Sequence, residues 1–580
     1  MKLRTKERGV ALLVATVCLV SMLGLALGLF YTSMADRQES IVNQALTQAI
    51  AVAEGATEKA EKELLEAAAN YNPIPTGGTF TVNGLSADYT IEPVGDVITG
   101  KSLEGVKTVE QQYIITSTAE VNNMHKQVQK LVNVSSIPLF QFAIFYNDDL
   151  EILPGPSLDI NGPIHTNGDM YVGAGSTLKI NTDYVRAVGR MYRRRKDTDE
   201  PTSGGVEFKV WGINRFEKMV EKKLFKPESV SGFDSDFLGY DADGDGTFDG
   251  RHDYPSWTIG ALDLWNGAVR TAEHGAKEIA APDIATIKRF VETETGSGGD
   301  YTYDAASGEY VAVAPGMGDY EKGFYHERAN VVIIDGVVYK NGEVFDSWPD
   351  VTGDGYPDSP ISESTFYDAR EETYVTVTNV DMGILAEAGA WPDNGLLYAA
   401  RTDASVEQPN GIRITNAATL VGPLTIATEN PLYTLGDFNR DHPNSPKRPA
   451  AIMTDAFNVL SDRWDDSKLP GERPPDANPT YINAAIMTGA HPTEDGAYNG
   501  GFENLPRFHE RWNGSPANIL GSFVHGWHSE IAMGKWAYGD DRYTALSRDW
   551  DYDRDFDDPG FLPPFTPKVT YIKRVVWVSR

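Results

Sequence analysis

The chain begins with a short basic segment that is followed by a long stretch without any charge. Residues 1–9 carry four basic side chains and one acidic one, and residues 10–31 give 22 uncharged, mostly apolar residues. At ~1.5 Å per residue, a helix of this length is roughly 33 Å long, enough to cross the ~30 Å hydrocarbon core of a membrane. The positive-inside rule predicts that residues 1–9 are a cytoplasmic leader and that the rest of the chain lies outside.

The helical pattern continues beyond the uncharged stretch. Apolar residues recur every three or four positions up to Asn70, and Pro73 and Pro75 then end the helix. We therefore expect one helix over residues 10–70, transmembrane at 10–31 and amphipathic afterwards. A secretory signal peptide is the alternative, although such segments have an apolar run of only ~7–15 residues. The expected buried stripe is Ile41, Ala45, Ala49, Val52, Ala56, Ala60 and Leu64.

The overall composition excludes several functional classes. The 580 residues include 83 acidic and 51 basic side chains, a formal charge of −32, and nucleic-acid binding needs clustered basic residues. The single cysteine, Cys18, excludes intramolecular disulfides and cysteine-cluster metal sites. The 55 glycines and 33 prolines favour a chain that is mainly β after its long N-terminal α-helix.

Two kinds of β structure are expected after the helix. Residues 79–135 predict a small antiparallel sheet with turns at Asn83-Gly84 and Asn122-Asn123. Residues 138–189 and 391–580 carry short strands that recur, and Ala451-Ile452-Met453-Thr454 returns as Ala485-Ile486-Met487-Thr488. Such repeats predict a parallel β-helix in which each coil stacks on the next. A β-sandwich is the alternative. Near the C-terminus, Asp549, Asp551, Asp553, Asp555 and Asp557 alternate with other residues and predict an acidic edge strand.

Residues 190–390 interrupt this pattern of short recurring strands, and we expect them to form an inserted lobe. The segment begins with the basic run 193–196, expected as a solvated loop, and holds two predicted helices, Phe216–Phe225 and Asp283–Glu294. Val331–Ile334 and Val337–Tyr339 flank Asp335-Gly336 and predict a hairpin.

The inserted segment also contains two aspartate-rich loops that predict calcium binding. A hard cation needs six to eight oxygen ligands at ~2.3–2.6 Å, and glycine at the sixth position permits the sharp turn. Position 12 is His252 in the first loop and Ile361 in the second, so we expect weak affinity. Asp-Gly turns without metal are the alternative. The candidate ligands are Asp241, Asp243, Asp245, Thr247 and Asp249 in the first loop, and Asp350, Thr352, Asp354, Tyr356 and Asp358 in the second. The loops resemble calcium loops of EF-hand, thrombospondin-repeat and integrin-propeller proteins.

The N-terminal segment resembles a known family. Arg8-Gly9-Val10-Ala11-Leu12-Leu13-Val14 is similar to the start of PilX-like pilus-assembly proteins and other type IV pilin-like subunits. The resemblance implies cleavage between Gly9 and Val10 by a prepilin peptidase, with other pilin-like subunits and the inner-membrane assembly machinery as partners. Major pilins carry glutamate at the fifth mature position, where this chain has Val14, so the resemblance is to minor pilins.

Together these observations predict a structural, non-enzymatic, minor pilin-like or surface-adhesion protein. It would cross the bacterial inner membrane once and hold its β-rich body in the periplasm or at the cell surface. The alternative is an anchored or secreted β-helix protein that binds or cleaves surface polysaccharide, and a surface glycan is a candidate partner in either case. The sequence lacks the HExxH and GxSxG motifs. His525, His528 and Glu530 lie close together in sequence, and we expect a structural rather than a metal-binding role for them.

Overall fold

The computed structural model describes residues 5–101, 105–219, 234–236, 256–289, 301–304, 309–312, 323–539 and 542–579. The chain is mainly β with one long N-terminal helix, which confirms the expected fold class. It divides into two compact units. The helix–sheet unit comprises Met1–Ile98, Glu110–Ser135 and Thr570–Arg580, and the β-rich unit comprises Thr99–Val109 and Ser136–Val569.

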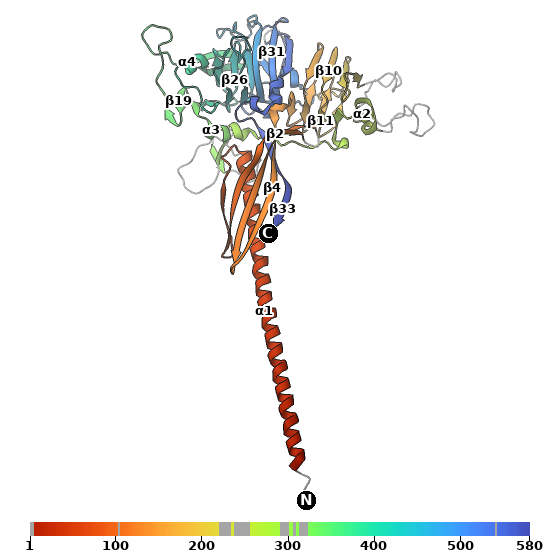
Figure 1. The fold of residues 1–580 in the computed structure, drawn as a ribbon. Coiled ribbons are helices and arrows are strands. Elements are labelled where there is room, and N and C mark those ends of the chain that lie inside the picture. Colours follow the sequence, from red (N-terminus) through yellow and green to blue (C-terminus); the bar gives the residue numbers. More distant parts are fainter. Residues whose placement is uncertain are drawn as a thin grey trace, which may run out of the picture. The chain divides into compact units, whose positions relative to one another are not determined.

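The helix–sheet unit is built on helix α1 (Thr5–Ala69), which has two distinct halves. The side chains of residues 10–44 are exposed, whereas those from Ala45 to Leu64 on the predicted stripe are at most 4% exposed. Ile41 is the one predicted stripe residue that is not buried. It is 49% exposed, because the part of α1 that packs on the sheet begins at Ala45. In Figure 1 the second half of α1 lies along the strands and the first half extends beyond them.

Five strands form the sheet that packs on α1, in the order β1-β2-β3-β4-β33. The predicted turns are confirmed, since Asn83, Gly84, Asn122 and Asn123 all have the positive φ that tight hairpins require. Gly55 of α1 allows close packing, because a Cβ there would lie 2.6 Å from the Phe80 ring. The strands are β1 (Gly77–Val82), β2 (Leu85–Lys101), β3 (Lys107–Val121), β4 (Met124–Pro138) and β33 (Lys568–Ser579). The last strand therefore comes from the far end of the sequence.

The β-rich unit is dominated by a 13-stranded sheet in which most neighbours are parallel. The sequence repeat pairs with itself in register, because β27 and β29 align Ala451 with Ala485 and Thr454 with Thr488. The order is β15 (Val269–Arg270), β11 (Val185–Ala187), β8 (Ile164–Thr166), β5 (Ile144–Tyr146), β31 (Pro516–His528), β29 (Thr480–Ala490), β27 (Ala450–Thr454), β25 (Leu424–Ala427), β23 (Leu396–Ala400), β18 (Val331–Ile334), β19 (Val337–Lys340) and β20 (Glu343–Val344), with β32 (Ser547–Tyr552) paired to β31.

Strands of this large sheet alternate along the chain with those of a six-stranded sheet. Between β22 and β31 the chain runs alternately through the two sheets, and each circuit adds one parallel strand to each sheet. Apolar side chains of successive circuits therefore stack between the two sheets. A parallel β-helix over residues 138–189 and 391–580 stays a prediction. The six strands are β21 (Ile361–Asp368), β22 (Thr373–Asp381), β24 (Gly411–Thr415), β26 (Leu432–Leu435), β28 (Phe457–Leu460) and β30 (Arg507–Phe508).

Strand β31 joins the early and late coils of the chain. Its residues 523–525 pair in parallel with residues 144–146 of β5, which are nearly 400 positions away in sequence. Other strands of residues 150–218 form two smaller sheets. These are β7 (Leu158–Asn161), β10 (Thr177–Asn181), β13 (Gly205–Lys209) and β14 (Phe216–Lys218), and β6 (Leu150–Ile152), β9 (Met170–Val172) and β12 (Met191–Tyr192), with a separate hairpin of β16 (Tyr301–Asp304) and β17 (Glu309–Ala312).

Residues 190–390, expected as an inserted lobe, are interleaved with these sheets in their described part. They supply β15 and β18 to the large sheet and β22 to the six-stranded sheet, all by parallel pairing with flanking segments. The predicted hairpin at Asp335-Gly336 is present. The predicted helix from Phe216 is wrong at its start, because residues 216–218 pair with β13 as strand β14. The predicted helix from Asp283 is also wrong, because only a 3-10 turn forms, Ile284–Ile287, and Lys288 after it is extended.

Short helices complete the β-rich unit. The acidic edge strand is confirmed only to Tyr552, because Arg554–Asp557 form a 3-10 turn and Asp553 is buried against Lys447 at 2.7 Å. The α-helices are α2 (Trp257–Trp265), α3 (Phe324–Arg328) and α4 (Met382–Glu387), and the 3-10 helices are η1 (Leu139–Gln141), η2 (Ala272–His274), η3 (Ile284–Ile287), η4 (Phe502–Asn504), η5 (Arg554–Asp557) and η6 (Pro559–Phe561).

Candidate functional site

Three loops of the β-rich unit enclose a cavity of about 510 Å³. The loops follow β12, β29 and β31. We call this cavity the Trp536 pocket. Its walls are Arg195, Asp197, His491, Pro492, Glu494, Gly496, Ala497, Tyr498, Asn499, Lys535, Trp536 and Ala537.

Two aromatic rings dominate the wall of the Trp536 pocket. The rings of Tyr498 and Trp536 meet edge to face with their centroids 5.4 Å apart. Trp536 donates a 2.9 Å hydrogen bond from Nε1 to the hydroxyl of Tyr543, which in turn donates to Asn504 Oδ1 at 2.6 Å. The Arg195 guanidinium lies 4.6 Å from the centroid of Tyr498. The Trp536 ring is therefore held in one orientation.

The charged residues of the pocket are of both signs. Arg195 donates to Asp197 through Nε at 2.8 Å and Nη2 at 2.9 Å, and this pairing raises the pKa of Arg195. Glu494 and Lys535 are exposed. Within the described part of the chain, no ion pair involves either of them. Two acidic and two basic side chains thus line the cavity.

Two buried carboxyl groups lie beside Tyr498. An added Cβ at Gly501 would collide with the Tyr498 hydroxyl and lie 3.0 Å from Glu503 Oε2. Burial raises the pKa of Glu503 to about 7, and it also raises the pKa of Glu151. Burial, together with the charges of Glu503 and Glu151, raises the pKa of Tyr498 well above its ordinary value. Burial therefore favours the uncharged form of each of these groups.

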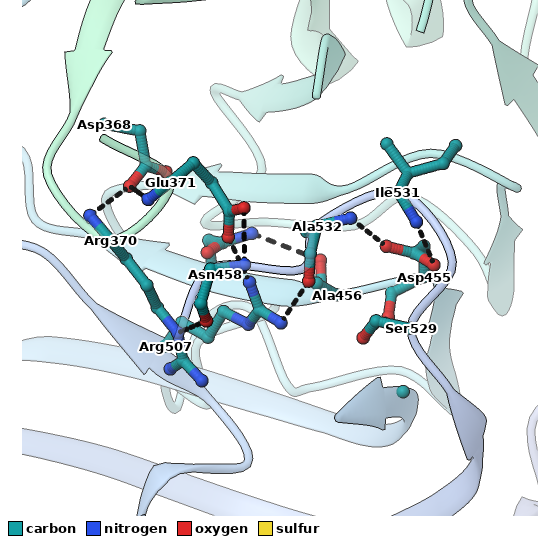
Figure 2. Close-up of polar contacts among 12 residues, drawn as sticks. Asp368, Arg370, Glu371, Asp455, Ala456, Asn458, Arg507, Ser529, Ile531 and Ala532 are labelled. Carbon is teal, nitrogen blue, oxygen red and sulfur yellow. Dashed lines mark hydrogen bonds and ion pairs between the residues drawn. The ribbon is translucent and has the colours of Figure 1, made fainter. Parts of the chain in front are cut away.

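The loop that carries Trp536 is anchored at its start by Asp455 (Figure 2). The Asp455 side chain accepts backbone hydrogen bonds from Glu530 at 2.5 Å, Ile531 at 3.2 Å and Ala532 at 2.8 Å. Its own carbonyl accepts a 2.8 Å bond from Ser529 Oγ. Asp455 directly follows β27 and is fully buried, so the loop after β31 is tied to a neighbouring coil.

A buried ion pair holds the next part of the same loop (Figure 2). Arg507 lies 2.6 Å from Glu371 and donates a 2.8 Å bond to the carbonyl of Ala532. Glu371 also accepts a 2.7 Å bond from the Gly534 amide, and Arg370 Nε donates to the Gly534 carbonyl at 3.1 Å. Arg507 and Glu371 are 2% and 5% exposed, so each would be costly to leave unpaired.

Asp368 fixes the segment that carries Arg370 and Glu371. It accepts backbone bonds from Arg370 at 2.8 Å and Glu371 at 3.1 Å, and its other oxygen accepts from the Tyr433 hydroxyl at 2.8 Å. Burial lowers the pKa of His509, which lies 3.6 Å from Asp368. Asp368, Arg370 and Glu371 thus all bond backbone groups, and through Gly534 they hold the chain next to Lys535 and Trp536.

The first candidate calcium loop, Asp241 to Asp249, lies outside the described residues. In the second loop, the carboxylate of Asp350 accepts from the amides of Gly353, Asp354 and Gly355 at 2.7–3.1 Å. Asp358 accepts from the amides of Val351 and Thr352, which lowers its pKa. Asp354 binds the Tyr356 amide at 2.9 Å. Asp350 and Asp358 are thus brought into one turn, while Tyr356 is 73% exposed.

Calcium binding at these loops stays a prediction. In the described ranges, no group of three or more His, Cys, Asp or Glu side chains is arranged as metal ligands. The second loop has carboxylate and carbonyl oxygens of the type that calcium prefers, and its glycines Gly353 and Gly355 have the positive φ that a tight wrap needs. The carboxylate oxygens of Asp350 and Asp358 accept hydrogen bonds from backbone amides. A bound cation would have to share these oxygens with the amides.

The three residues considered for another metal site each have a different partner. His525 is buried, and burial lowers its pKa to about 4. His528 lies 2.6 Å from Asp148, a contact that lowers the pKa of Asp148 to about 2 and raises that of His528. Glu530 instead lies 2.6 Å from Lys288. His525 also stacks on the Tyr146 ring, with the two centroids 4.9 Å apart. A structural role for the three residues stays a prediction.

The residues of the Trp536 pocket were not predicted from the sequence. The basic run 193–196 was expected to be solvated, but Arg193 is 7% exposed and bonds Thr202 at 2.6 Å, while Arg195 forms part of the pocket wall. Tyr498 and Trp536 lie in loops that follow β29 and β31, and an aromatic residue in each of these loops was the available signal. At the processing site, Val10 lies in α1 and is 63% exposed.

Comparisons with known proteins give little further guidance. No family model and no curated protein matches this chain. Among solved structures, the chain is similar to the competence-associated pilin ComZ from Thermus thermophilus, with 11% sequence identity and a TM-score of 0.28, over 93% of this chain and 98% of that one. A likeness at this score carries no inference about function.

Proposed function

We propose that this chain is a membrane-inserted minor pilin-like subunit that carries a β-rich body outside the cytoplasm. The observation that supports this most directly is the division of α1. Its first part is apolar and is not buried by any of the described residues. It is also long and apolar enough to cross a membrane, with mean hydropathy 2.6 over its most apolar window. Its second part is buried against a small sheet.

A helix of this kind suits a subunit that passes from a membrane into an assembly. The same exposed apolar face, Val10–Tyr31, can pack among lipid tails or among the equivalent helices of other pilin-like subunits. The basic leader ending in Gly9 supports processing by a prepilin peptidase. The partners would be other pilin-like subunits and the inner-membrane machinery that assembles them.

We also propose that the subunit is present in few copies. Val14 stands where a carboxylate would pair with the amino terminus of a neighbouring subunit. Without that charge contact, the subunit suits a tip or an initiation complex. Quantitative proteomics of sheared filaments should find it far below the major subunit. The role would be structural, with calcium at the aspartate loops serving to stiffen them.

Amino-terminal sequencing of the mature protein from cells tests the proposal. We expect a chain that starts at Val10, with residues 10–31 retained. Gly9→Val should block processing and leave the leader attached, whereas Gly24→Val, a matched change inside the apolar stretch, should still be processed. A mature chain that begins near Asp36 would show a cleaved signal peptide and would overturn the proposal.

A further inference from the structure

We propose that the Trp536 pocket is a binding site for a neutral saccharide. Its volume of about 510 Å³ lies within the ~300–1,000 Å³ range of small-molecule sites. The wall combines aromatic surface with a few polar side chains, which is the combination that a sugar ring needs. The proposal does not depend on whether the chain is assembled into a filament.

Trp536 supplies the apolar surface against which the C–H face of a sugar ring would stack. An aromatic ring offers a large, rigid contact area at low entropic cost. The Arg195 guanidinium covers one face of Tyr498, and Trp536 also lines the cavity. The bond from Trp536 Nε1 to Tyr543 leaves the ring held in place before any ligand arrives.

The polar side chains of the pocket match the hydroxyl groups of a saccharide. Sugar hydroxyls both donate and accept hydrogen bonds, and Glu494 accepts while Lys535 donates. Neither side chain has an ion-pair partner in the part of the chain that the structure describes. Both can therefore bond a ligand without first breaking a contact.

The charges of the pocket favour a neutral ligand over an acidic one. Arg195 is already paired with Asp197, which leaves Glu494 and Lys535 as one charge of each sign. An anionic sugar would meet the carboxylate of Glu494, which has no ion-pair partner among the described residues. The chain as a whole carries a formal charge of −32, which further disfavours approach of an anion.

The pocket is also preorganised, as a specific site requires. The Asp455 and Glu371–Arg507 contacts hold residues 530–534 through their backbone, immediately before Lys535 and Trp536. Such anchoring lowers the conformational entropy lost when a ligand binds. Several buried polar groups thus fix the backbone of the loop that carries Lys535 and Trp536.

Calorimetric titration of the full-length protein tests this inference. The protein is purified in a detergent without a sugar headgroup, because alkyl glycosides would compete for the site. The neutral probes are cellohexaose, mannohexaose and maltohexaose, and hexagalacturonate is the acidic probe. We expect saturable binding of at least one neutral probe and weaker or no binding of the acidic one.

Variants locate the binding to the pocket. Trp536→Ala should weaken the affinity at least tenfold, and Trp577→Ala, which removes another half-exposed tryptophan, should leave it unchanged. Glu494→Gln and Lys535→Met alter exposed side chains, so they should weaken binding several-fold without changing the melting temperature. Failure of all three neutral probes to bind at millimolar concentration would overturn the inference. So would binding that survives Trp536→Ala, or tighter binding of hexagalacturonate that Lys535→Met abolishes.

Discussion

The ammonium group of Lys130 in β4 lies 3.0 Å from a carboxylate oxygen of Glu61 in α1, and the two side chains are only 6% and 9% exposed. Lys130 also lies 2.6 Å from Glu58, and Arg574 of β33 donates a 2.9 Å bond to Glu61. Helix α1, strand β4 and the C-terminal strand β33 of the helix–sheet unit are therefore joined by one cluster of charges, in which Lys130 and Glu61 are the buried pair.

Removing Lys130 should destabilise the helix–sheet unit. Loss of one partner of a buried ion pair costs about 3–5 kcal/mol, and because Arg574 still neutralises Glu61 we expect about 2–4 kcal/mol for Lys130→Met. Hydrogen exchange of residues 115–134 in the full-length protein measures this locally. Lys126→Met, on the same strand but without an ion pair in the described residues, should change exchange little. Adding Glu61→Gln to Lys130→Met should recover part of the loss, and no recovery would argue against the cluster.

The buried carboxyl of Glu503 should make stability depend on pH. Its pKa of about 7 in the folded chain is above its ordinary value near 4.5, so its stabilising contribution is complete below pH 4.5 and is lost as the pH rises through 7. Glu503→Gln cannot ionise. It should therefore be more stable than the parent at pH 8, on the order of 1–3 kcal/mol, and nearly equal to it at pH 4.5. Thermal unfolding at the two pH values measures this, and Glu494→Gln, at an exposed position, should show no such pH-dependent difference.

Gly500 should be required for the geometry of the Trp536 pocket. Its φ is +98°, and an added Cβ would lie 2.7 Å from both Trp536 Cδ1 and Asn504 Cβ. Gly500→Ala should lower stability by about 2–3 kcal/mol and displace the Trp536 ring. Gly496→Ala is the matched control, because its φ is +71° but nothing lies within 4 Å of the added Cβ, so only about 1 kcal/mol of backbone strain is expected. Thermal unfolding and tryptophan fluorescence distinguish the two variants, and equal effects would contradict the role of Gly500.

Calcium should stabilise the β-rich unit if the aspartate loops bind it. Scanning calorimetry of the full-length protein should show a higher melting temperature in millimolar calcium, and addition of a chelator should reverse the shift. The Asp245→Ala, Asp354→Ala double variant should lose the shift, while Asp346→Ala, an aspartate just outside the second loop, should keep it. No shift in the parent protein would end the calcium hypothesis.

Features that depend on local sequence could be predicted. The turns at Asn83-Gly84 and Asn122-Asn123 follow from the few residues that tolerate positive φ, and the apolar stripe from Ala45 to Leu64 follows from helical periodicity. The in-register pairing of Ala451 with Ala485 also follows from the sequence, because identical segments present the same apolar pattern to each other. The helix predicted from Phe216 failed because pairing with β13 overrides local propensity over a few residues.

The sequence by itself determined the long helix, its division into an apolar and an amphipathic part, and the mainly β character of the rest. These depend on periodicity and composition, which are properties of neighbouring residues. Only the tertiary structure decided that β31 pairs with β5, that β33 returns to the first sheet, and that Arg195, Tyr498 and Trp536 share one cavity. Contacts between residues hundreds of positions apart depend on how coils stack, and no local pattern in a single sequence records that order.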